Sequence, residues 1–307
     1  MNPQRITVTV DLGRVRRSAE EIRRHCSVEV LAVVKADGYG LGAKQVAACL
    51  ADVVDGFVVF SLAEVRAAGL NDISKKPILA IGPHPDTSAE EFRAAGVRPS
   101  VWTVAEATRL RSADPVLSVD TGMNRFTCPR NEIEAVLAAG GCREAFTHAT
   151  RIQQVHQLKS LLGGRGRKLH AAASSLLDEP DAWLDAVRPG LALYRGAVRV
   201  STPLIEIRDG GNPAGYTGFT VPKFGIIGCG YRDGLRKGPC LVGGVRRRVL
   251  EVGMQSAYVE ISPGDRPGEE VILLGDGLTE AQIAAEWETA AHEVLLRMAR
   301  MGNSGPV

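Results

Sequence analysis

The sequence predicts an α/β protein with a (β/α)8 barrel of the TIM type followed by a small β-rich domain. Between residues 28 and 196, short apolar runs alternate with amphipathic stretches, a pattern typical of parallel strands joined by crossover helices. After Gly196, prolines and glycines separate shorter strand-like runs. A doubly wound open sheet is the alternative for the first part, because periodicity does not reveal whether a sheet closes.

Eight segments are expected to be the strands of the barrel. They are VEVLAVVK, GFVVFS, KPILAIG, VRPSVW, VLSVD, AFTH, KLHAAA and, for the eighth, either LDAVR or LALYR. The amphipathic stretches between them are AKQVAACLADV, LAEVRAAGL, SAEEFRAAG, VAEATRLRSA, RNEIEAVLAAG and RIQQVHQLKSLLGG. Eight strand–helix units in about 170 residues fit a compact barrel.

The second domain is expected to contain FTVPKFGIIGC, RRVLEVGM, AYVEI and EVILLG as strands and TEAQIAAEWETAAHEVLLRMAR as one closing helix. The segment 203–215, rich in glycine and proline, is expected to link the domains. We therefore place the barrel at 10–198 and the β-rich domain at 199–307. The opening RITVTVDL alternates like a strand and could pair with either domain; we assign residues 1–9 to the second.

Composition favours a protein that acts on a small molecule. Lysine and arginine number 37 against 35 for aspartate and glutamate, so no strong field favours nucleic acid or an anionic membrane. No apolar run approaches the roughly 20 residues of a membrane span, and the start lacks a signal-peptide pattern, so we expect a cytoplasmic protein. The six cysteines form no CxxC pair and are expected to be free thiols, with no metal site.

Lys35 ends the first apolar run, in the stretch VLAVVKADGYGLGA. In a barrel, the carboxyl ends of the strands form the active face. A partly desolvated lysine there has a lowered pKa and exposes a nucleophilic amine, which a Schiff base requires. A surface lysine just past a strand is the structural alternative.

Further polar residues follow the later strands. Ser174 and the Gly190 backbone come after the seventh and eighth strands, the usual phosphate site of this fold. A lysine, a phosphate cradle and an arginine together suggest pyridoxal 5′-phosphate. The other polar residues at strand ends are Asp120, Arg125, His148 and Arg188.

With these residues in order, the sequence resembles the alanine racemase family of pyridoxal-phosphate enzymes from about Ile6 to the last helix. The segment AVVKADGYGLG resembles the family's cofactor-lysine segment, and VDTGMNR its central arginine segment. RPGLALY resembles the segment for the ring nitrogen and the phosphate, and GYRDG the catalytic-tyrosine segment. In the family LALYR is helical, which makes LDAVR the eighth strand, ending at Arg188.

The resemblance implies roles for the residues around the cofactor. Lys35 would hold it covalently and act as one of two bases, and Arg188 would face the pyridine nitrogen. An arginine does not readily give up its proton, so the ring is a weaker electron sink, which disfavours transamination. The phosphate would be bound by Tyr39, Ser174, His292 and the backbone of Gly190 and Leu191.

The resemblance also implies how the substrate is handled. Tyr231 would be the second base on the opposite face of Cα, with His148 and Arg188 as a relay that stabilises its phenolate. Arg125 and the Met254 backbone would bind the substrate carboxylate. Because lysine and tyrosine belong to different domains, the family implies a homodimer in which each tyrosine reaches the partner's barrel.

Four positions depart from the family pattern, and the C-terminal domain is shortened, with only 23 positions separating Tyr231 from Met254. Ala173 replaces a common asparagine, and Ser118 stands where some relatives have a carbamylated lysine. His292 stands near the place of a phosphate-binding tyrosine, and Gln255 follows Met254 where an aspartate is common. The predicted function is racemisation of alanine or a similar small amino acid. The alternatives are a fold-type III amino-acid decarboxylase, against which the Tyr231 motif argues, and a non-catalytic pyridoxal-phosphate-binding homologue.

Overall fold

The computed structural model describes residues 6–301, which form two compact units. The barrel unit contains Leu12–Gly38 and Gly42–Leu193. The β unit contains the described residues up to Asp11, the short segment Tyr39–Leu41 and the described residues from Tyr194 onward. Residues 1–5 of the segment that we assigned to the second domain, and the end of the chain from 302 to 307, lie outside the described residues.

The barrel is closed by eight parallel strands. Each strand pairs with the next along the chain, and β2 pairs with β9 at Glu29↔Ala186 and Val30↔Val187. This last pairing excludes the open sheet. The strands are β2 (Glu29–Val33), β3 (Gly56–Val59), β4 (Ile78–Ala80), β5 (Val97–Val101), β6 (Val116–Ser118), β7 (Glu144–Ala149), β8 (Lys168–Ala172) and β9 (Ala186–Val187).

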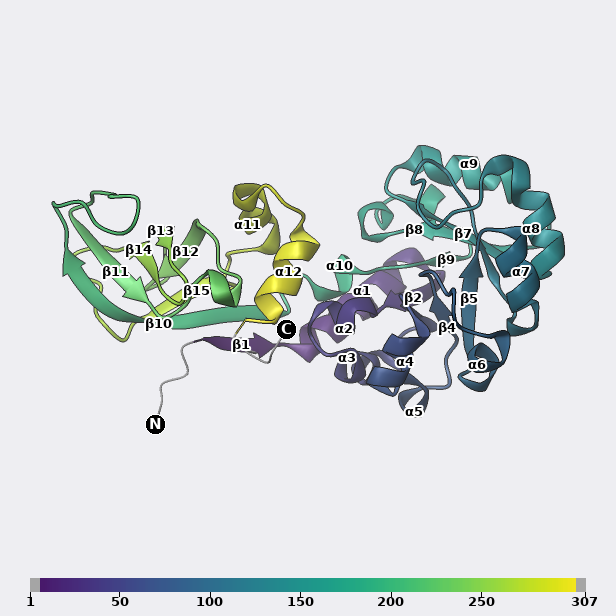
Figure 1. Cartoon of the computed structure of the whole chain (residues 1–307), viewed down its shortest axis with the longest axis horizontal. Coiled ribbons are helices and arrows are strands. Elements are labelled where there is room, and N and C mark those ends of the chain that lie inside the picture. The colour runs from purple at the N-terminus through teal and green to yellow at the C-terminus, as the bar shows by residue number, and fades with distance from the viewer. Residues whose placement is uncertain (1–5, 302–307) are drawn as a thin grey trace. The chain divides into compact units, whose positions relative to one another are not determined.

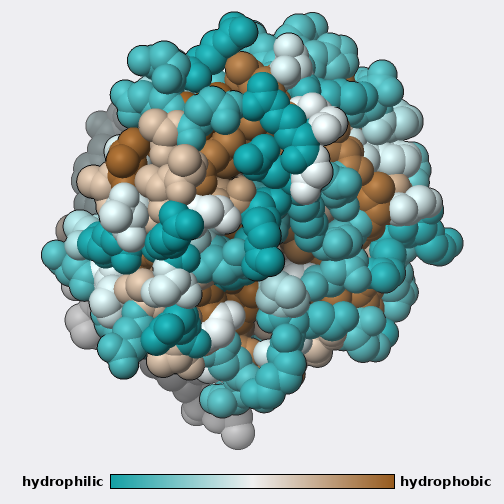
Figure 2. Space-filling model, turned by 90° about the vertical axis from the view of Figure 1, so that its right-hand side faces the viewer, coloured by the Kyte–Doolittle hydropathy of each residue, from teal (hydrophilic) through white to brown (hydrophobic). Residues whose placement is uncertain are grey.

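Helices cover the outside of the strands (Figure 1). The surface seen from the right-hand side of Figure 1 is largely hydrophilic, with apolar residues in small patches between polar ones (Figure 2). The helices are α1 (Leu12–Cys26), α3 (Ala43–Leu50), α4 (Leu62–Ala68), α5 (Leu70–Ile73), α6 (Ala89–Ala94), α7 (Val104–Leu110), α8 (Ile133–Gly140), α9 (Ile152–Leu162) and α10 (Leu191–Tyr194). Short 3₁₀ turns are η1 (Arg111–Ala113), η2 (Arg130–Glu132), η3 (Ser174–Leu176) and η4 (Pro180–Ala182).

The strands are apolar because both of their faces are covered. All four residues of β3 are buried, as are the last four of β2. Leu117 in β6 has no exposed surface. Strands of this kind read as continuous apolar runs, which is why they were recognisable in the sequence.

The eighth strand is the LDAVR segment, as the family resemblance implied. Ala186–Val187 forms β9, and LALY forms helix α10. Arg188 therefore follows β9 directly, and its N–H donates to the Ala172 carbonyl of the neighbouring β8 at 2.8 Å. This bond fixes where the side chain leaves the barrel wall.

A left-handed turn, α2 (Lys35–Tyr39), follows the first barrel strand. Ala36, Asp37, Gly38 and Tyr39 all have φ between 54° and 63°. This conformation costs about 1–2 kcal/mol for each residue that carries a Cβ. Asp37 compensates in part, because its carboxylate accepts from the N–H of Ala43 at 2.7 Å. The strand ends at Val33, and Lys35 begins the turn that follows it.

The β unit is a seven-stranded antiparallel sheet in the order β1-β10-β11-β14-β13-β12-β15. Strand β1 pairs with β10, with Thr7 opposite Ser201. The strands are β1 (Thr7–Val10), β10 (Val198–Asp209), β11 (Lys223–Ile227), β12 (Gly238–Val242), β13 (Val245–Val252), β14 (Ala257–Glu260) and β15 (Glu270–Leu274), with η5 (Tyr231–Asp233) as a 3₁₀ turn.

Two expectations for this part of the chain were wrong. The closing helix is two helices, α11 (Glu280–Trp287) and α12 (Ala291–Ala299), because Glu288 adopts a left-handed conformation with φ 51° and ends the first. The start of the expected linker is strand: β10 continues through Pro203 to Asp209. Proline is tolerated there at an irregular point of the ladder, beside the register shift between Leu204 and Glu206.

All six cysteines are free thiols, and five of them are buried. Within residues 6–301, no helix is both long and apolar enough to cross a membrane.

Candidate active site

Lys35 lies at the carboxyl end of β2, half-buried, with other cationic groups around it. Its pKa is lowered, first by burial and then by the positive charges of Arg125 and Arg188. The carboxylate of Glu64 acts in the opposite direction. A lysine in these surroundings offers a larger neutral fraction, and therefore a better nucleophile and base, than a lysine in water.

Arg188 is the buried cation of the site, with 5% of its surface exposed. Its guanidinium donates to the Thr147 carbonyl at 2.6 Å and to Nδ1 of His170 at 2.5 Å. Burial lowers its pKa to about 10, which leaves it charged at neutral pH. The imidazole of His148 is kept neutral, because burial and the charges of Arg188, Lys35 and Arg125 lower its pKa to about 4.

A cluster of backbone donors lies where β8 and β9 end. The hydroxyl of Ser174 accepts from the N–H groups of Gly190 and Ala192, each at 3.0 Å. Leu191 lies between these two residues and begins helix α10. Ser174 and this helix start are therefore adjacent, as the sequence predicted, and they present a hydroxyl and backbone amides, groups that suit a phosphate.

Arg125 lies on an exposed loop that Asp120 organises. One carboxylate oxygen of Asp120 accepts from the N–H of Gly122 at 2.8 Å and of Asn124 at 3.1 Å. Asn124 takes up a left-handed conformation, with φ 51°. The loop brings the charge of Arg125 close enough to act on both Lys35 and His148.

The β unit carries the other predicted residues. Tyr231 and Met254, 23 positions apart in the sequence, are neighbours there: the Tyr231 N–H donates to the Gly253 carbonyl at 2.9 Å, and the Arg232 N–H to the Met254 carbonyl at 3.0 Å. A Cβ on Gly230 would lie 2.4 Å from two of these carbonyl oxygens, so only glycine permits this approach.

Two more predicted residues lie elsewhere in the β unit. The ring of Tyr39 stacks on Tyr194 with centroids 4.7 Å apart, and burial raises the pKa of Tyr39 to about 12. His292 is exposed in the first turn of α12.

Some polar residues that support the site were not predicted from the sequence. These are Arg98, Glu144 and His170, which connect to Arg188 inside the barrel, and Glu64, which contacts the backbone next to Lys35 from the first turn of α4. A signal was present: each of the first three stands at or inside an apolar strand segment. A charged residue buried in such a segment needs a partner, and partners on adjacent strands could have been sought.

The fold and the site together define a class: a barrel enzyme with a lysine of lowered pKa at a strand end, two nearby arginines and an antiparallel β domain in the same chain. The family model for the alanine racemase N-terminal domain matches residues 10–198, and that for the C-terminal domain matches residues 204–303. The chain belongs to the alanine racemase family.

Curated relatives match over nearly their whole length. An alanine racemase of Jannaschia sp. is 29% identical, with 94% of this chain and 95% of that protein covered. An alanine racemase of Aeromonas hydrophila is 27% identical, with 94% and 96% covered. A biosynthetic alanine racemase of Salmonella typhimurium is 27% identical, with 96% and 97% covered.

Solved structures of alanine racemases have the same fold as this chain. The biosynthetic alanine racemase of Pseudomonas aeruginosa superposes with a TM-score of 0.86 at 27% identity, and 97% of each chain is covered. The alanine racemase of Bartonella henselae, solved with covalently bound pyridoxal phosphate, has a TM-score of 0.85 at 22% identity, over 95% of this chain and 97% of that one, which shows the common fold.

Proposed function

We propose that this chain is a pyridoxal-phosphate-dependent racemase that interconverts L- and D-alanine. The observation that carries the proposal is Lys35, a strand-end lysine whose pKa is lowered by burial and by Arg125, in a chain of the alanine racemase family. A small amino acid is the expected partner, with no role for nucleic acid or a membrane surface. We also propose a cytoplasmic location, and 10–198 and 199–307 as the functional domains.

The donor set of the barrel unit suits the cofactor. Lys35 supplies the amine that attaches to an aldehyde, and Arg188 a fixed cation for the pyridine nitrogen. Bound pyridoxal phosphate withdraws electrons from Cα of the amino acid and so acidifies the Cα proton. We assign the phosphate to Ser174, Gly190, Leu191, Tyr39 and His292.

Two residues are proposed to move the Cα proton. Lys35 removes or returns it on one face, helped by the lowered pKa of its amine. Tyr231 acts on the other face, where its phenol must lose a proton before it can serve as a base. His148, whose imidazole is neutral and in range of the Arg188 charge, is proposed to form with Arg188 a relay that stabilises the phenolate. Arg125 and the Met254 backbone orient the substrate carboxylate.

A homodimer is proposed as the active form. Tyr231 and Met254 lie side by side and expose 57% and 59% of their surface, although their side chains are large and hydrophobic. Exposed residues of this kind, held on a rigid turn, are typical of positions that a partner covers. The proposed partner is a second copy of the chain, so that each site combines Lys35 of one copy with the partner's Tyr231.

Mixed dimers test this arrangement. Lys35→Ala and Tyr231→Phe should each be nearly inactive, whereas subunit exchange between them rebuilds one intact site per mixed dimer. Random pairing then restores about a quarter of wild-type activity. If exchange is verified by differential tagging and no activity returns, the shared site is wrong.

The reaction itself is tested by incubating purified protein and cofactor with L-alanine in D₂O. Racemisation predicts D-alanine with deuterium at Cα and no release of CO₂. Decarboxylation would release CO₂ instead, and a non-catalytic protein would do neither. Borohydride should fix the cofactor on the peptide that contains Lys35; a saturated protein with that peptide unlabelled would overturn the assignment.

A further inference from the structure

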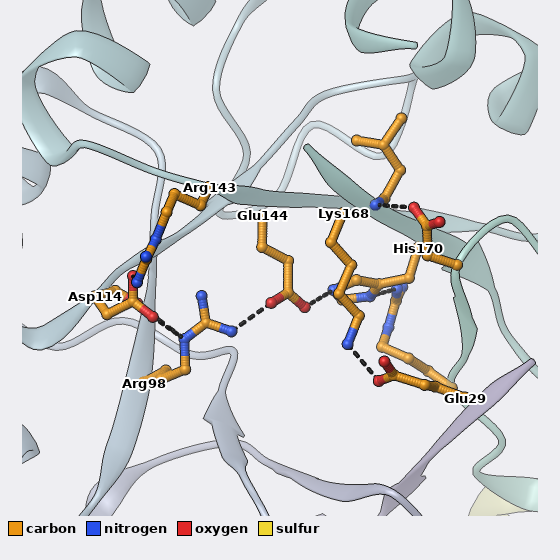
Figure 3. A network of polar contacts seen from close by, with 10 residues as sticks. Glu29, Arg98, Asp114, Arg143, Glu144, Lys168 and His170 are labelled. Carbon is orange, nitrogen blue, oxygen red and sulfur yellow. Dashed lines mark hydrogen bonds and ion pairs between the residues drawn. The ribbon is translucent and has the colours of Figure 1, made fainter. Parts of the chain in front are cut away.

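A chain of charged and polar side chains runs inside the barrel and ends at Arg188. Arg98 in β5 donates to Glu144 at the start of β7, and Glu144 Oε1 lies 2.9 Å from Nε2 of His170 in β8 (Figure 3). His170 Nδ1 in turn contacts Arg188 at 2.5 Å. Glu144 and His170 are 6% and 0% exposed. The chain is therefore buried along the part that reaches the site.

The chemistry of the partners determines the proton on His170. A guanidinium has only donors, so Nδ1 of His170 must accept from Arg188. A neutral imidazole has one acceptor and one donor, which places its proton on Nε2, facing the Glu144 carboxylate. The Glu144 carboxylate has only acceptors, so it favours a proton on the nitrogen that lies 2.9 Å from it. Arg188 thus requires an unprotonated Nδ1 on His170, and the proton on Nε2 requires an acceptor such as ionised Glu144.

The pKa shifts of Arg188, His170 and Glu144 agree with these protonation states. Burial lowers the pKa of Arg188, and the negative charge of Glu144 opposes that shift. Burial lowers the pKa of His170 to about 4, so the ring is neutral as its contacts require. Burial alone would raise the pKa of Glu144, but the hydrogen bond from His170 and the charge of Arg98 hold it at about 2.

Arg98 in turn is anchored at the amino ends of the strands. It pairs with Asp114 at 2.9 Å, and Asp114 pairs with the more exposed Arg143 at 3.2 Å. Figure 3 shows this anchor on one side of Glu144 and His170 on the other. The carboxylate of Glu144 is consequently held between two fixed groups, which lets it orient the imidazole.

We propose that Glu144, acting through His170, is a positioning residue that keeps the Arg188 guanidinium charged and in one orientation toward the cofactor's pyridine nitrogen. The inference rests on the proposed function, in which Arg188 faces that nitrogen. A displaced Arg188 would leave the nitrogen open to protonation by water. The ring would then be a stronger electron sink, and transamination would compete with racemisation.

The first test is the proton on His170, and it needs no turnover. Long-range ¹H–¹⁵N spectra of the holoenzyme, labelled at histidine nitrogen and assigned with His170→Gln, should show Nε2 protonated and Nδ1 bare. Glu144→Gln offers an amide that can donate to Nε2, and the proton can then move to Nδ1 in those molecules in which Arg188 has been displaced, so both tautomers should be populated. A wild-type spectrum with the proton on Nδ1 would overturn the inference whatever the protein catalyses.

The second test is the ratio of transamination to racemisation with L-alanine. Transamination moves the amino group from the substrate to the cofactor and leaves a 2-oxo acid, which a coupled dehydrogenase measures. In Glu144→Gln the ratio should rise about 10- to 100-fold, by analogy with the loss of activity when the hydrogen-bond partner of a metal-binding side chain is removed. Because both reactions use the same folded molecules, partial unfolding does not change the ratio.

Three further variants separate positioning from folding. Glu29→Gln removes a pair with Lys168 at the same end of the barrel but outside the chain to Arg188, and its ratio should equal that of the wild type. His170→Gln keeps a donor and an acceptor, so its ratio should stay below that of His170→Leu, which has neither. An unchanged ratio in folded Glu144→Gln refutes the proposal. A wild type that racemises nothing refutes the proposed function instead, and the tautomer test still stands.

Discussion

Glu64 should control the local stability of the turn that carries Lys35. It occupies the third position of α4, after the N-cap Ser61, whose hydroxyl accepts from the Glu64 N–H at 3.4 Å. Its carboxylate accepts from the N–H of Phe60 at 2.7 Å and from the N–H of Ala36, next to Lys35, at 2.9 Å. It therefore ties the loop after β2 to the loop after β3.

A glutamate at the third position of a helix usually caps the start of that helix, as the glutamate of α6 does. There, Glu91 holds the same position after Ser88 and returns a carboxylate oxygen to the Ser88 N–H at 3.0 Å, which is an ordinary capping box. Glu64 instead reaches Ala36, whose φ of 54° is unfavourable for a residue with a Cβ.

The magnitude follows from these contacts. A hydrogen bond to a charged group contributes about 1.5–3 kcal/mol, and an exposed one contributes less. The bond from Ala36 is partly buried and the bond from Phe60 is exposed, so Glu64→Ala should lose about 3 kcal/mol of local stability. The strain at Ala36 and Asp37, about 1–2 kcal/mol per residue, favours opening once the carboxylate is gone. At 1.4 kcal/mol per factor of ten, the opening equilibrium of the turn shifts about 100-fold.

The assay is amide hydrogen exchange of the cofactor-free protein, followed by mass spectrometry on peptides that cover residues 34–38. Glu64→Ala should exchange there about 100-fold faster, and Glu64→Gln, which keeps one acceptor oxygen, by an intermediate factor. Glu106→Ala is the matched control, because Glu106 holds the same position on α7. The hydrogen bonds of its carboxylate and its N–H among the described residues are with the hydroxyl of Thr103, the N-cap of its own helix. Exchange at 34–38 within about threefold of this control would refute the reasoning.

Three further outcomes are expected. The unfolding free energy should fall as pH drops from 6.5 to about 4, because His148 and His170 take up protons at a higher pH in the unfolded chain than in the folded chain. The loss is on the order of 2 kcal/mol per histidine. Urea titrations at several pH values measure it, and His170→Leu should reduce the dependence on pH in this range. Native protein should expose to Ellman's reagent at most the partly buried thiol of Cys49, and denatured protein all six. Leu117→Ala should lower the urea-derived unfolding free energy by about 2.5–5 kcal/mol through the cavity it leaves; a loss below about 1 kcal/mol would mean that the barrel interior repacks.

Much of the barrel was visible in the sequence because its strands are short apolar runs, and an apolar run has to be buried wherever it lies. The eighth strand shows the limit of that reasoning. Both LDAVR and LALYR have suitable composition, and β9 is only Ala186–Val187. The choice depended on which segment pairs with β2, a contact between residues more than 150 positions apart in the sequence.

The end of the β unit shows the same limit. The segment from 279 to 300 has the composition of one helix, but Glu288 takes a left-handed conformation and divides it. Glutamate has no strong local preference for that conformation. Packing of α11 against α12 and β12 accompanies the break, and such packing is not encoded in any one stretch of residues.

The sequence by itself determined the alternation of strands and helices, the position of Lys35 at a strand end and the motifs that assign the family, because each depends on neighbours along the chain. The tertiary structure decided the rest. The barrel closes through β2 and β9, and Arg98, Glu144, His170 and Arg188 meet only because four separate strands turn them toward one interior. A buried charge is tolerated only where partners from other strands satisfy it, and those partners are brought together by folding.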